Sequence, residues 1–450
     1  MGMPEQRIQM RRVFRTSSLV IFGLSYMVPL GIFTTYGQVT VLTHGHLPVA
    51  YIITLIAILF TALSYCKMSN VLPLSGSAYS YVHRTFGGNI GFFVGWAQIL
   101  DYLFLPILNF LVLGLYLNVA FPSIPSAVFI LVSLFIVTTL NILGIRLINS
   151  VNFIIIAGQF IFIGIFILLA FSKANLSPGA LLKPLLFNQG DIKGLLSGAA
   201  ILCLTFLGFD AIATMAEESS NAKNTIPAAI MLTVIIAGII FLFISYAAHI
   251  LYPDWQKLIP VQDTASVVIS EKAGGKWIYI FFMATYLTGT FASAMTAQTS
   301  ISRILYAMGR EGVLPRKIFY HLHQRFHTPY LSILIVSTIS LTALFLKLSL
   351  VVSMISFGAL GAFTFVNLSV IKHFLVNQKC RGMYEFFHYG LLPFIGVILT
   401  FWLWASLDHK AIMTGLVWMA VGIMYLALLT RGFRKMPPSA AHDEIDKIIK

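Results

Sequence analysis

Two acidic side chains stand inside long apolar stretches of this sequence, and they are the groups best suited to bind a cation. Asp101 lies in the stretch 88–118, and Asp210 lies in the stretch 194–217. A charged side chain in the middle of a membrane helix costs several kcal/mol (roughly 2.5–3.5 on insertion scales), so such a residue is a functional candidate by default. No lysine or arginine lies at a matching depth. Each acid is therefore protonated, held by hydrogen bonds as a structural acid, or neutralised by a cation that comes and goes.

Aromatic residues stand beside both acids. They are Tyr102 and Phe104 in the first stretch and Phe206 and Phe209 in the second. An aromatic face attracts an ammonium group, so these rings suit a cationic substrate, although each ring alone is also an ordinary packing residue. Phe209 is a candidate gate beside the site. Glu217 and Glu218 end the second stretch and predict either a gate pair or a solvated helix boundary.

Helix-breaking residues interrupt two of the apolar stretches. Pro29 and Gly31 follow Tyr26 halfway along the stretch 17–41, and Gly208 lies at the middle of the stretch 194–217. Proline removes a backbone donor and glycine relaxes the chain, so a helix can open at such places. Interrupted helices at corresponding places in two halves of a chain indicate a transporter with inverted repeats and a site at the membrane midplane. These four residues therefore join Asp101, Tyr102, Phe206 and Asp210 as the predicted substrate site.

The elements that must position these residues are membrane helices. Of 450 residues, 58% are hydrophobic and only 10% are charged, which excludes a soluble enzyme, a disordered chain and a coiled coil. A bilayer core needs about 20 apolar residues for each helix. We expect an all-α protein with twelve spans, at residues 17–41, 47–66, 88–118, 126–144, 150–171, 194–217, 227–251, 276–308, 329–346, 349–374, 388–407 and 411–430.

The spans divide the chain into a simple organisation. Residues 1–16 and 431–450 are predicted tails, and residues 17–430 form the membrane domain. Two halves of five helices each cover about 17–171 and 194–374, and helices 1 and 6 are the interrupted first helix of each half. The last two helices, at about 388–430, lie outside the two halves.

Basic residues predict the orientation. Placing both termini in the cytoplasm puts most of the 29 lysines and arginines, including every arginine, on the inner side. The net charge of +14 is therefore explained by membrane topology, and nucleic acid is not an expected partner. The three cysteines are far apart and form no metal motif, so neither a metal nor a cofactor is expected.

Three segments show a resemblance to a known superfamily. They are residues 205–210 (Thr-Phe-Leu-Gly-Phe-Asp) with 216–230, residues 74–81 (Leu-Ser-Gly-Ser-Ala-Tyr-Ser-Tyr), and residues 302–315 from Ser302-Arg303 to Leu314-Pro315. They resemble the amino acid–polyamine–organocation (APC) superfamily of membrane transporters, over about residues 17–430. Within it, residues 100–106 and 357–370 are similar to bacterial putrescine importers.

The resemblance implies a five-plus-five inverted repeat (the LeuT-like or APC fold) with two additional C-terminal helices, in a bacterial inner membrane. It implies that Asp101 lines the substrate chamber and that Asp210 lies at the unwound part of helix 6. Amino acid permeases usually carry a Gly-Ser-Gly type of motif in helix 1, and here that place reads Pro29-Leu30-Gly31. A substrate carboxylate would find fewer amides there, whereas a diamine would lose nothing. A putrescine or polyamine importer is therefore expected, and an amino acid permease or exchanger is the alternative.

An enzyme and a nutrient sensor are two further classes of membrane protein to weigh. A membrane-embedded enzyme is disfavoured because the spans contain no HExxH, no GxSxG and no Cys/His cluster. A nutrient sensor on the same fold is not distinguished from a carrier. Proton coupling through Asp210 or Asp101 is preferred to sodium coupling, for which Thr290, Ser293 and Thr296 offer hydroxyls. The expected mechanism is alternating access.

Overall fold

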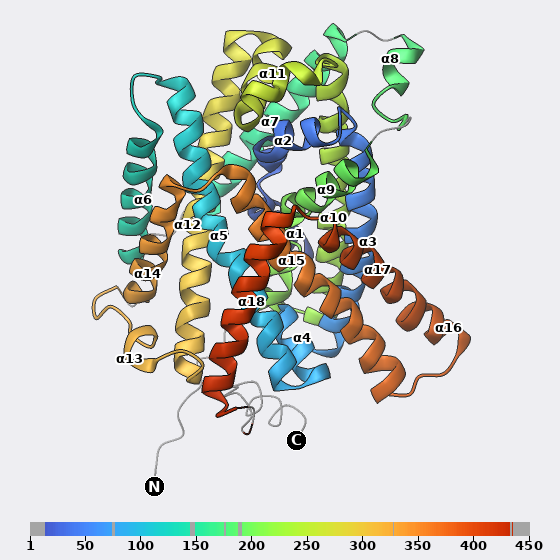
Figure 1. The fold of residues 1–450 in the computed structure, drawn as a ribbon, viewed down its shortest axis with the longest axis vertical. Coiled ribbons are helices and arrows are strands. Elements are labelled where there is room, and N and C mark those ends of the chain that lie inside the picture. The colour runs from blue at the N-terminus through green and yellow to red at the C-terminus, as the bar shows by residue number, and fades with distance from the viewer. Residues whose placement is uncertain are drawn as a thin grey trace.

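The computed structural model describes residues 14–73, 77–144, 149–174, 177–187, 191–326, 328–432 and 434, which form a bundle of helices (Figure 1). Among them the only β pairing is an isolated bridge between Phe14 and Ser219. Lipid offers no hydrogen bonds to a backbone, so apolar stretches form helices, which satisfy their own. Ten helices in the described part are long and apolar enough to cross a membrane, and Ser126–Ile142 and Tyr330–Leu344 are shorter apolar helices. The chain is a multi-pass membrane protein, and the count of twelve spans stays a prediction.

The first half of the chain begins with helix α1 (Thr16–Met27), a 3-10 turn η1 (Pro29–Gly31) and helix α2 (Ile32–Leu42). The helices that follow are α3 (Leu47–Val71), α4 (Ser77–Phe86), α5 (Gly88–Ala120), α6 (Ser126–Ile142) and α7 (Asn149–Lys173). Helix α4 was not among the predicted elements. It has many polar residues and lies between two long apolar helices, so a search for apolar stretches passes over it.

The second half contains a second interrupted segment, α9 (Ile192–Leu202), η2 (Cys203–Phe206) and η3 (Ala211–Glu218). Its other elements are α8 (Pro178–Leu182), α10 (Ala222–Leu251), η4 (Trp255–Thr264), α11 (Ala265–Gly274), α12 (Lys276–Glu311), α13 (Arg316–Phe319), α14 (Tyr330–Ser340), η5 (Leu341–Leu344) and α15 (Leu348–Ile371). Helices α8 and α11 lie at one end of the bundle, and α4 and α13 lie at the other (Figure 1).

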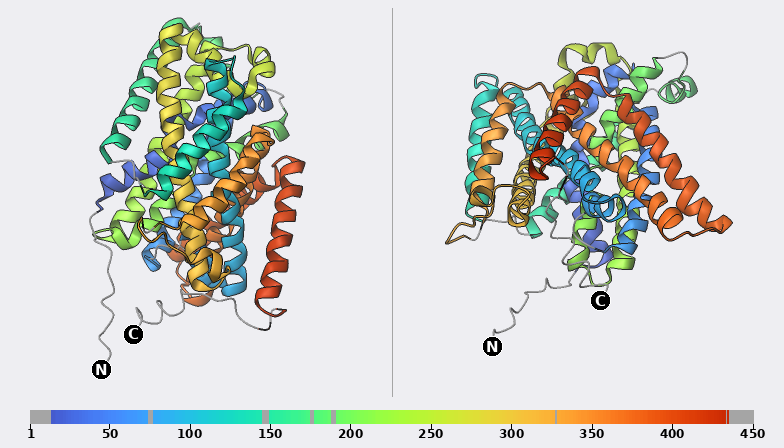
Figure 2. Two further views of the ribbon diagram at one scale, coloured as in Figure 1. Left: turned by 90° about the vertical axis from the view of Figure 1, so that its left-hand side faces the viewer. Right: turned by 60° about the horizontal axis from the view of Figure 1, so that its bottom comes forward.

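The last part of the chain packs on the outside of this bundle. It comprises the π-helical turn η6 (Lys372–Asn377), α16 (Met383–Glu385), the π-helical turn η7 (Phe386–Leu391), α17 (Leu392–Ala405) and α18 (His409–Leu429). Two further views show α18, drawn in red, along the outer surface of the bundle (Figure 2). The most buried span is Ile192–Ala216, with 94% of its most apolar window inside the protein, against 17% for α18. The interior therefore surrounds the second interruption.

Candidate functional site

The first interruption lies at Val28, between α1 and η1. Val28 has a positive φ of 52°, which ends α1 and turns the chain into the short 3-10 turn. Pro29 has no N–H to donate, and the Gly31 N–H donates to the Val28 carbonyl at 2.6 Å. A break inside a membrane leaves backbone groups without their usual helical partners, so each must find another.

A side chain from a different helix supplies one of those partners. The Leu30 N–H donates to Oε1 of Gln159 on α7, at 3.3 Å in a buried position. Gln159 is only 2% exposed. A Cβ atom on Gly289 of α12 would lie 2.1 Å from Nε2 of Gln159, so the glycine leaves the space that the amide occupies. Gln159 thus ties η1 to α7 beside α12.

The second interruption holds Asp210 in a defined position. Leu207 is extended, and Gly208 has a φ of +130°, a conformation that side chains with a Cβ rarely adopt. The Gly208 N–H donates to Oδ1 of Asp210 at 3.1 Å, and the Ser77 hydroxyl of α4 donates to the Asp210 main-chain carbonyl at 3.3 Å. The carboxyl is therefore fixed by the backbone that it interrupts.

The two interruptions touch each other. A Cβ atom on Gly208 would lie 3.0 Å from Cδ1 of Tyr26 and 3.1 Å from Cγ of Met27, the residues that end α1. The predicted residues Tyr26 and Gly208 are therefore neighbours, one from each half of the chain. A glycine is needed here both for its backbone conformation and for this close approach.

Asp101 lies on α5, facing helix α15. Its side chain is 6% exposed, and no hydrogen bond from a described residue reaches its carboxylate. A Cβ atom on Gly358 of α15 would lie 2.5 Å from the Ala97 carbonyl and 3.3 Å from Cβ of Asp101. The absence of a side chain at Gly358 thus lets α15 pack directly on the turn of α5 that carries the acid.

The two acids lie near each other. Asp101 lies close enough to Asp210 for their charges to interact, and Tyr26 and Tyr102 lie within the field of both. Asp210 is 4% exposed. No ion pair between described residues joins either carboxylate to a lysine or arginine. The site therefore holds two buried carboxyl groups that no lysine or arginine of the described chain pairs with.

The predicted aromatic residues lie in two different surroundings. Phe206 packs on Tyr51 and Phe241, with ring centroids 6.5 and 5.3 Å away, as a core residue does. Phe209 packs edge-on against Tyr65, with ring centroids 5.3 Å apart, and its ring is tilted relative to that of Phe363, 5.2 Å away. Tyr65 also interacts electrostatically with Asp210. Phe209 thus lies in an aromatic cluster next to the acids, whereas the ring contacts of Phe206 are with α3 and α10.

The predicted gate residue Glu217 is in η3, and its side chain, like that of Glu218, lies outside the described part of the structure. Its role stays a prediction.

A small cavity with both polar and apolar lining residues continues from the site along α5. It has a volume of about 50 Å³, room for a few water molecules, and lies between η1, α2, η2, α5 and α12. Tyr26, Val28, Gly31, Thr34, Asn109, Thr205, Tyr286, Thr290 and Ser293 are among the residues that line it. The Asn109 amide donates to the Ser293 hydroxyl at 3.0 Å, and the Thr34 and Tyr286 hydroxyls lie 2.7 Å apart. Leu105 and Leu108 also line the cavity and share a face of α5 with Asp101.

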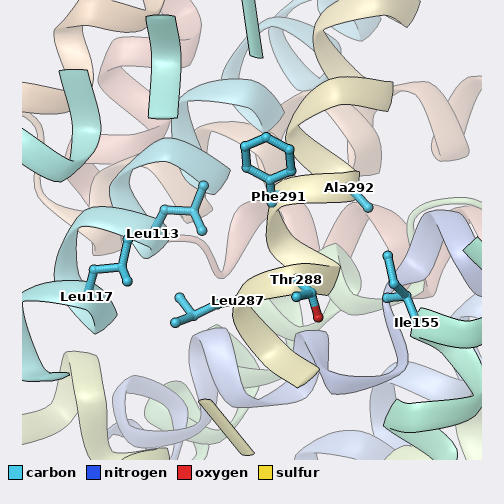
Figure 3. Close-up of a pocket in the computed structure, with 7 residues that line it drawn as sticks. All are labelled: Leu113, Leu117, Ile155, Leu287, Thr288, Phe291 and Ala292. Carbon is cyan, nitrogen blue, oxygen red and sulfur yellow. The ribbon is translucent and has the colours of Figure 1, made fainter. Parts of the chain in front are cut away.

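A larger pocket on the outer side of α12 has a different character. It has a volume of about 310 Å³ and lies between α5, α7 and α12 (Figure 3). Its lining is Leu113, Leu117, Ile155, Leu287, Thr288, Phe291 and Ala292. The Thr288 hydroxyl donates to the Ala284 and Thr285 carbonyls of its own helix. This pocket offers hydrocarbon surface and nothing for a charged ligand.

Sequence reasoning missed three residues of this site. Gln159 and Gly358 were not singled out, because glutamine and glycine are common in membrane helices and their contacts come from distant segments. Tyr65 was missed because it stands in an apolar stretch, where a tyrosine is an ordinary packing residue. The polar character of Gln159 within the stretch 150–171 was the one available signal.

Comparison with known proteins gives consistent results. The profile of the family described as amino acid permease matches residues 18–407. The low-affinity putrescine importer PlaP of Escherichia coli (strain K12) is 36% identical over 437 residues, which cover 96% of each chain. The branched-chain amino acid permease BcaP of Bacillus subtilis (strain 168) is 25% identical, over 95% of each chain. Cationic amino acid transporter 7 of Arabidopsis thaliana is 28% identical over 81% of this chain and 65% of its own.

Proposed function

Because this chain belongs to the amino acid permease family and is a membrane transporter rather than an enzyme, we propose that it imports putrescine or a related polyamine. The observation that carries the proposal is the buried pair Asp101 and Asp210, which no lysine or arginine of the described chain balances. A substrate with two ammonium groups can place one beside each of these carboxyl groups. Tyr26 and Tyr102 add aromatic rings beside the pair.

The hydrogen bonds of the first interruption favour a diamine over an amino acid as the substrate. Holding a substrate carboxylate there requires free N–H groups, and this turn has none to spare: Pro29 has no donor, the Leu30 N–H is used by Gln159, and the Gly31 N–H by Val28. An amino acid would have to displace these bonds, whereas a diamine needs none of the three donors. The name of the E. coli relative, a putrescine importer, agrees with this preference.

The same pair of carboxyl groups supports coupling to protons. A pair of carboxylates without a resident cation is neutralised by ammonium groups when substrate is bound, and by protons when it has left. We propose that Asp210 and Asp101 exchange one kind of positive charge for the other as the two interrupted helices alternate between the two sides of the membrane. The proposal includes twelve spans in a five-plus-five inverted repeat, with Phe209 and Glu217 as gates and both termini in the cytoplasm.

The decisive experiment is uptake of labelled putrescine into proteoliposomes, with and without an inward proton gradient. Competition with spermidine, lysine, ornithine and a neutral amino acid defines the substrate class. Loss of a charged hydrogen bond costs about 1.5–3 kcal/mol, so Asp101→Asn is expected to raise the KM for putrescine roughly 10- to 150-fold.

Asp254→Asn is the matched control. Asp254 is exposed and forms an ion pair with Lys257 at 2.8 Å, unlike the two buried acids. Replacing it is therefore expected to leave uptake unchanged. Inhibition by a neutral amino acid together with full activity of Asp101→Asn would refute the polyamine proposal. It would favour the alternative that the B. subtilis relative suggests, an amino acid permease or exchanger.

A further inference from the structure

Helix α18 is joined to helix α5 by a reciprocal pair of tryptophans. The indole N–H of Trp96 donates to the Trp418 carbonyl at 3.0 Å, and the indole N–H of Trp418 donates to the Trp96 carbonyl at 3.0 Å. The two rings are stacked with centroids 5.0 Å apart. A buried indole usually finds one acceptor, and here each residue is both donor and acceptor for the other. This arrangement fixes α18 and α5 in one register.

Helix α17 makes a similar contact with α15. The indole N–H of Trp404 donates to the Phe357 carbonyl at 3.1 Å, and its ring lies 5.0 Å from the Phe357 ring. Phe357 also fills the space over Gly415 of α18, where a Cβ atom would lie 2.5 Å from the ring. Both C-terminal helices therefore hold the same residue of α15.

These two attachments meet next to Asp101. Phe357 precedes Gly358, which packs against the Ala97 carbonyl of α5, and Trp96 precedes Ala97. The Trp96 and Phe357 carbonyls accept the indole hydrogen bonds of Trp418 and Trp404. Each of these two carbonyls thus belongs to the residue immediately before one of the two residues that make the contact between α5 and α15. Asp101 is on the next turn of α5, with its own N–H 3.1 Å from the Cβ position of Gly358.

We propose that α17 and α18 act as a brace that positions Asp101 for the substrate, with Trp96, Trp404 and Trp418 as its positioning residues. The proposal rests on the proposed function of Asp101. No described residue bonds to the Asp101 carboxylate, so its location depends on how α5 is seated against α15. The brace fixes that seat from outside the site, through main-chain carbonyls of both helices.

The glycines of α18 show that the fit is close. A Cβ atom on Gly422 would lie 2.4 Å from Cδ1 of Trp96, so close that the Trp96 ring would have to shift. Gly415 meets Phe357 in the same way, seven residues earlier on the same face of α18. A methyl group at Gly422 or Gly415 therefore shifts the brace without removing any tryptophan.

The test compares Trp418→Phe and Trp404→Phe with Trp402→Phe in full-length protein. Trp402 is also on α17, is 48% exposed, and its indole bonds to no described residue, so it controls for the loss of an indole. A misplacement of 1 Å can cost about 10²-fold, and we expect the partial loosening here to raise the KM for putrescine roughly tenfold. Maximal uptake per folded transporter stays near wild type, and Trp402→Phe leaves KM unchanged.

Two further measurements keep the result decisive. Trp96→Phe combined with Trp418→Phe is expected to raise KM by less than the product of the single effects, because the two residues serve one contact. Hydrogen–deuterium exchange of residues 96–105 in lipid nanodiscs is expected to quicken in Trp418→Phe and Gly422→Ala, with or without substrate.

An unchanged KM in all tryptophan variants, with only a lower melting temperature, would overturn the brace and leave these residues as stabilising contacts. Wild-type protein that takes up no diamine would refute the proposed function instead. Exchange of residues 96–105 then decides the brace alone: faster exchange in the variants supports it, and unchanged exchange overturns it.

Discussion

Replacing Gln159 with leucine tests whether a side chain of α7 holds the first interruption in place. Leucine has a similar size and is apolar, so the change removes the acceptor of the Leu30 N–H and little else. The site is buried, since Gln159 is 2% exposed. A buried donor that loses its only partner costs about 1–3 kcal/mol. This corresponds to roughly a 5- to 150-fold shift against the conformation described here.

The assay combines thermal unfolding of purified protein with initial uptake rates. We expect a melting temperature lower by a few degrees, because each kcal/mol moves the midpoint by about 2–4 °C in a chain of 150–250 residues and by less in a longer one. Gly289→Ala is a second route to the same effect, because its Cβ would lie 2.1 Å from Nε2 of Gln159 and displace the amide.

Gln38→Leu is the matched control. Gln38 on α2 is 8% exposed, and its buried Oε1 accepts no hydrogen bond from the described part of the chain. Removing an amide that lacks a partner is expected to be neutral or stabilising. Equal losses in Gln159→Leu and Gln38→Leu would refute the reasoning, since the bond to Leu30 would then contribute nothing to the interruption.

Two further predictions concern the second interruption and the loop before α11. Gly208→Ala is expected to lower the free energy of unfolding by about 1–3 kcal/mol, because Gly208 has a φ of +130° and an added Cβ would press on Tyr26. Gly164 has open space around it, so Gly164→Ala is the control and is expected to leave stability unchanged. Melting temperatures of the two variants check this, and equal values would contradict it. Burial raises the pKa of Asp263, and Lys347 opposes this effect. The folded state therefore favours the protonated carboxyl, and the protein loses stability as pH rises through that pKa and the group ionises. Asp263→Asn should therefore raise the melting temperature at pH 7, and this gain should vanish as pH falls below the ordinary pKa of an aspartate, about 3.9; a gain that persists at low pH would contradict it.

The sequence was informative where chemistry is local. Asp101 and Asp210 stand out because a charge in an apolar stretch is visible without any structure, and the segment around Gly208 predicted an all-helical transporter of the family that the comparisons confirm. Recognition of the family came from such short segments. Their roles in transport stay predictions.

Contacts between distant segments were beyond sequence reasoning. Gln159 bonds to a residue 129 positions away, and the tryptophan pair joins residues 322 positions apart. One sequence carries no record of which helices lie side by side, so the side chain that completes the interruption in α1 could not be identified. Phe206 shows the converse: its position beside Asp210 in sequence suggested a role in the site, yet its ring points to Tyr51 and Phe241.

The two acids differ in how firmly they are held, and under the proposed function this difference predicts an order of substrate release. Asp210 is anchored by the Gly208 N–H at 3.1 Å, whereas no described residue bonds to the carboxylate of Asp101. A stationary charge gives a ligand a fixed reference point, and a charge that can turn follows the ligand as it moves. If the pair binds a diamine as proposed, we expect one ammonium group to leave Asp101 while the other still rests on Asp210, so that release takes two small steps instead of one large one.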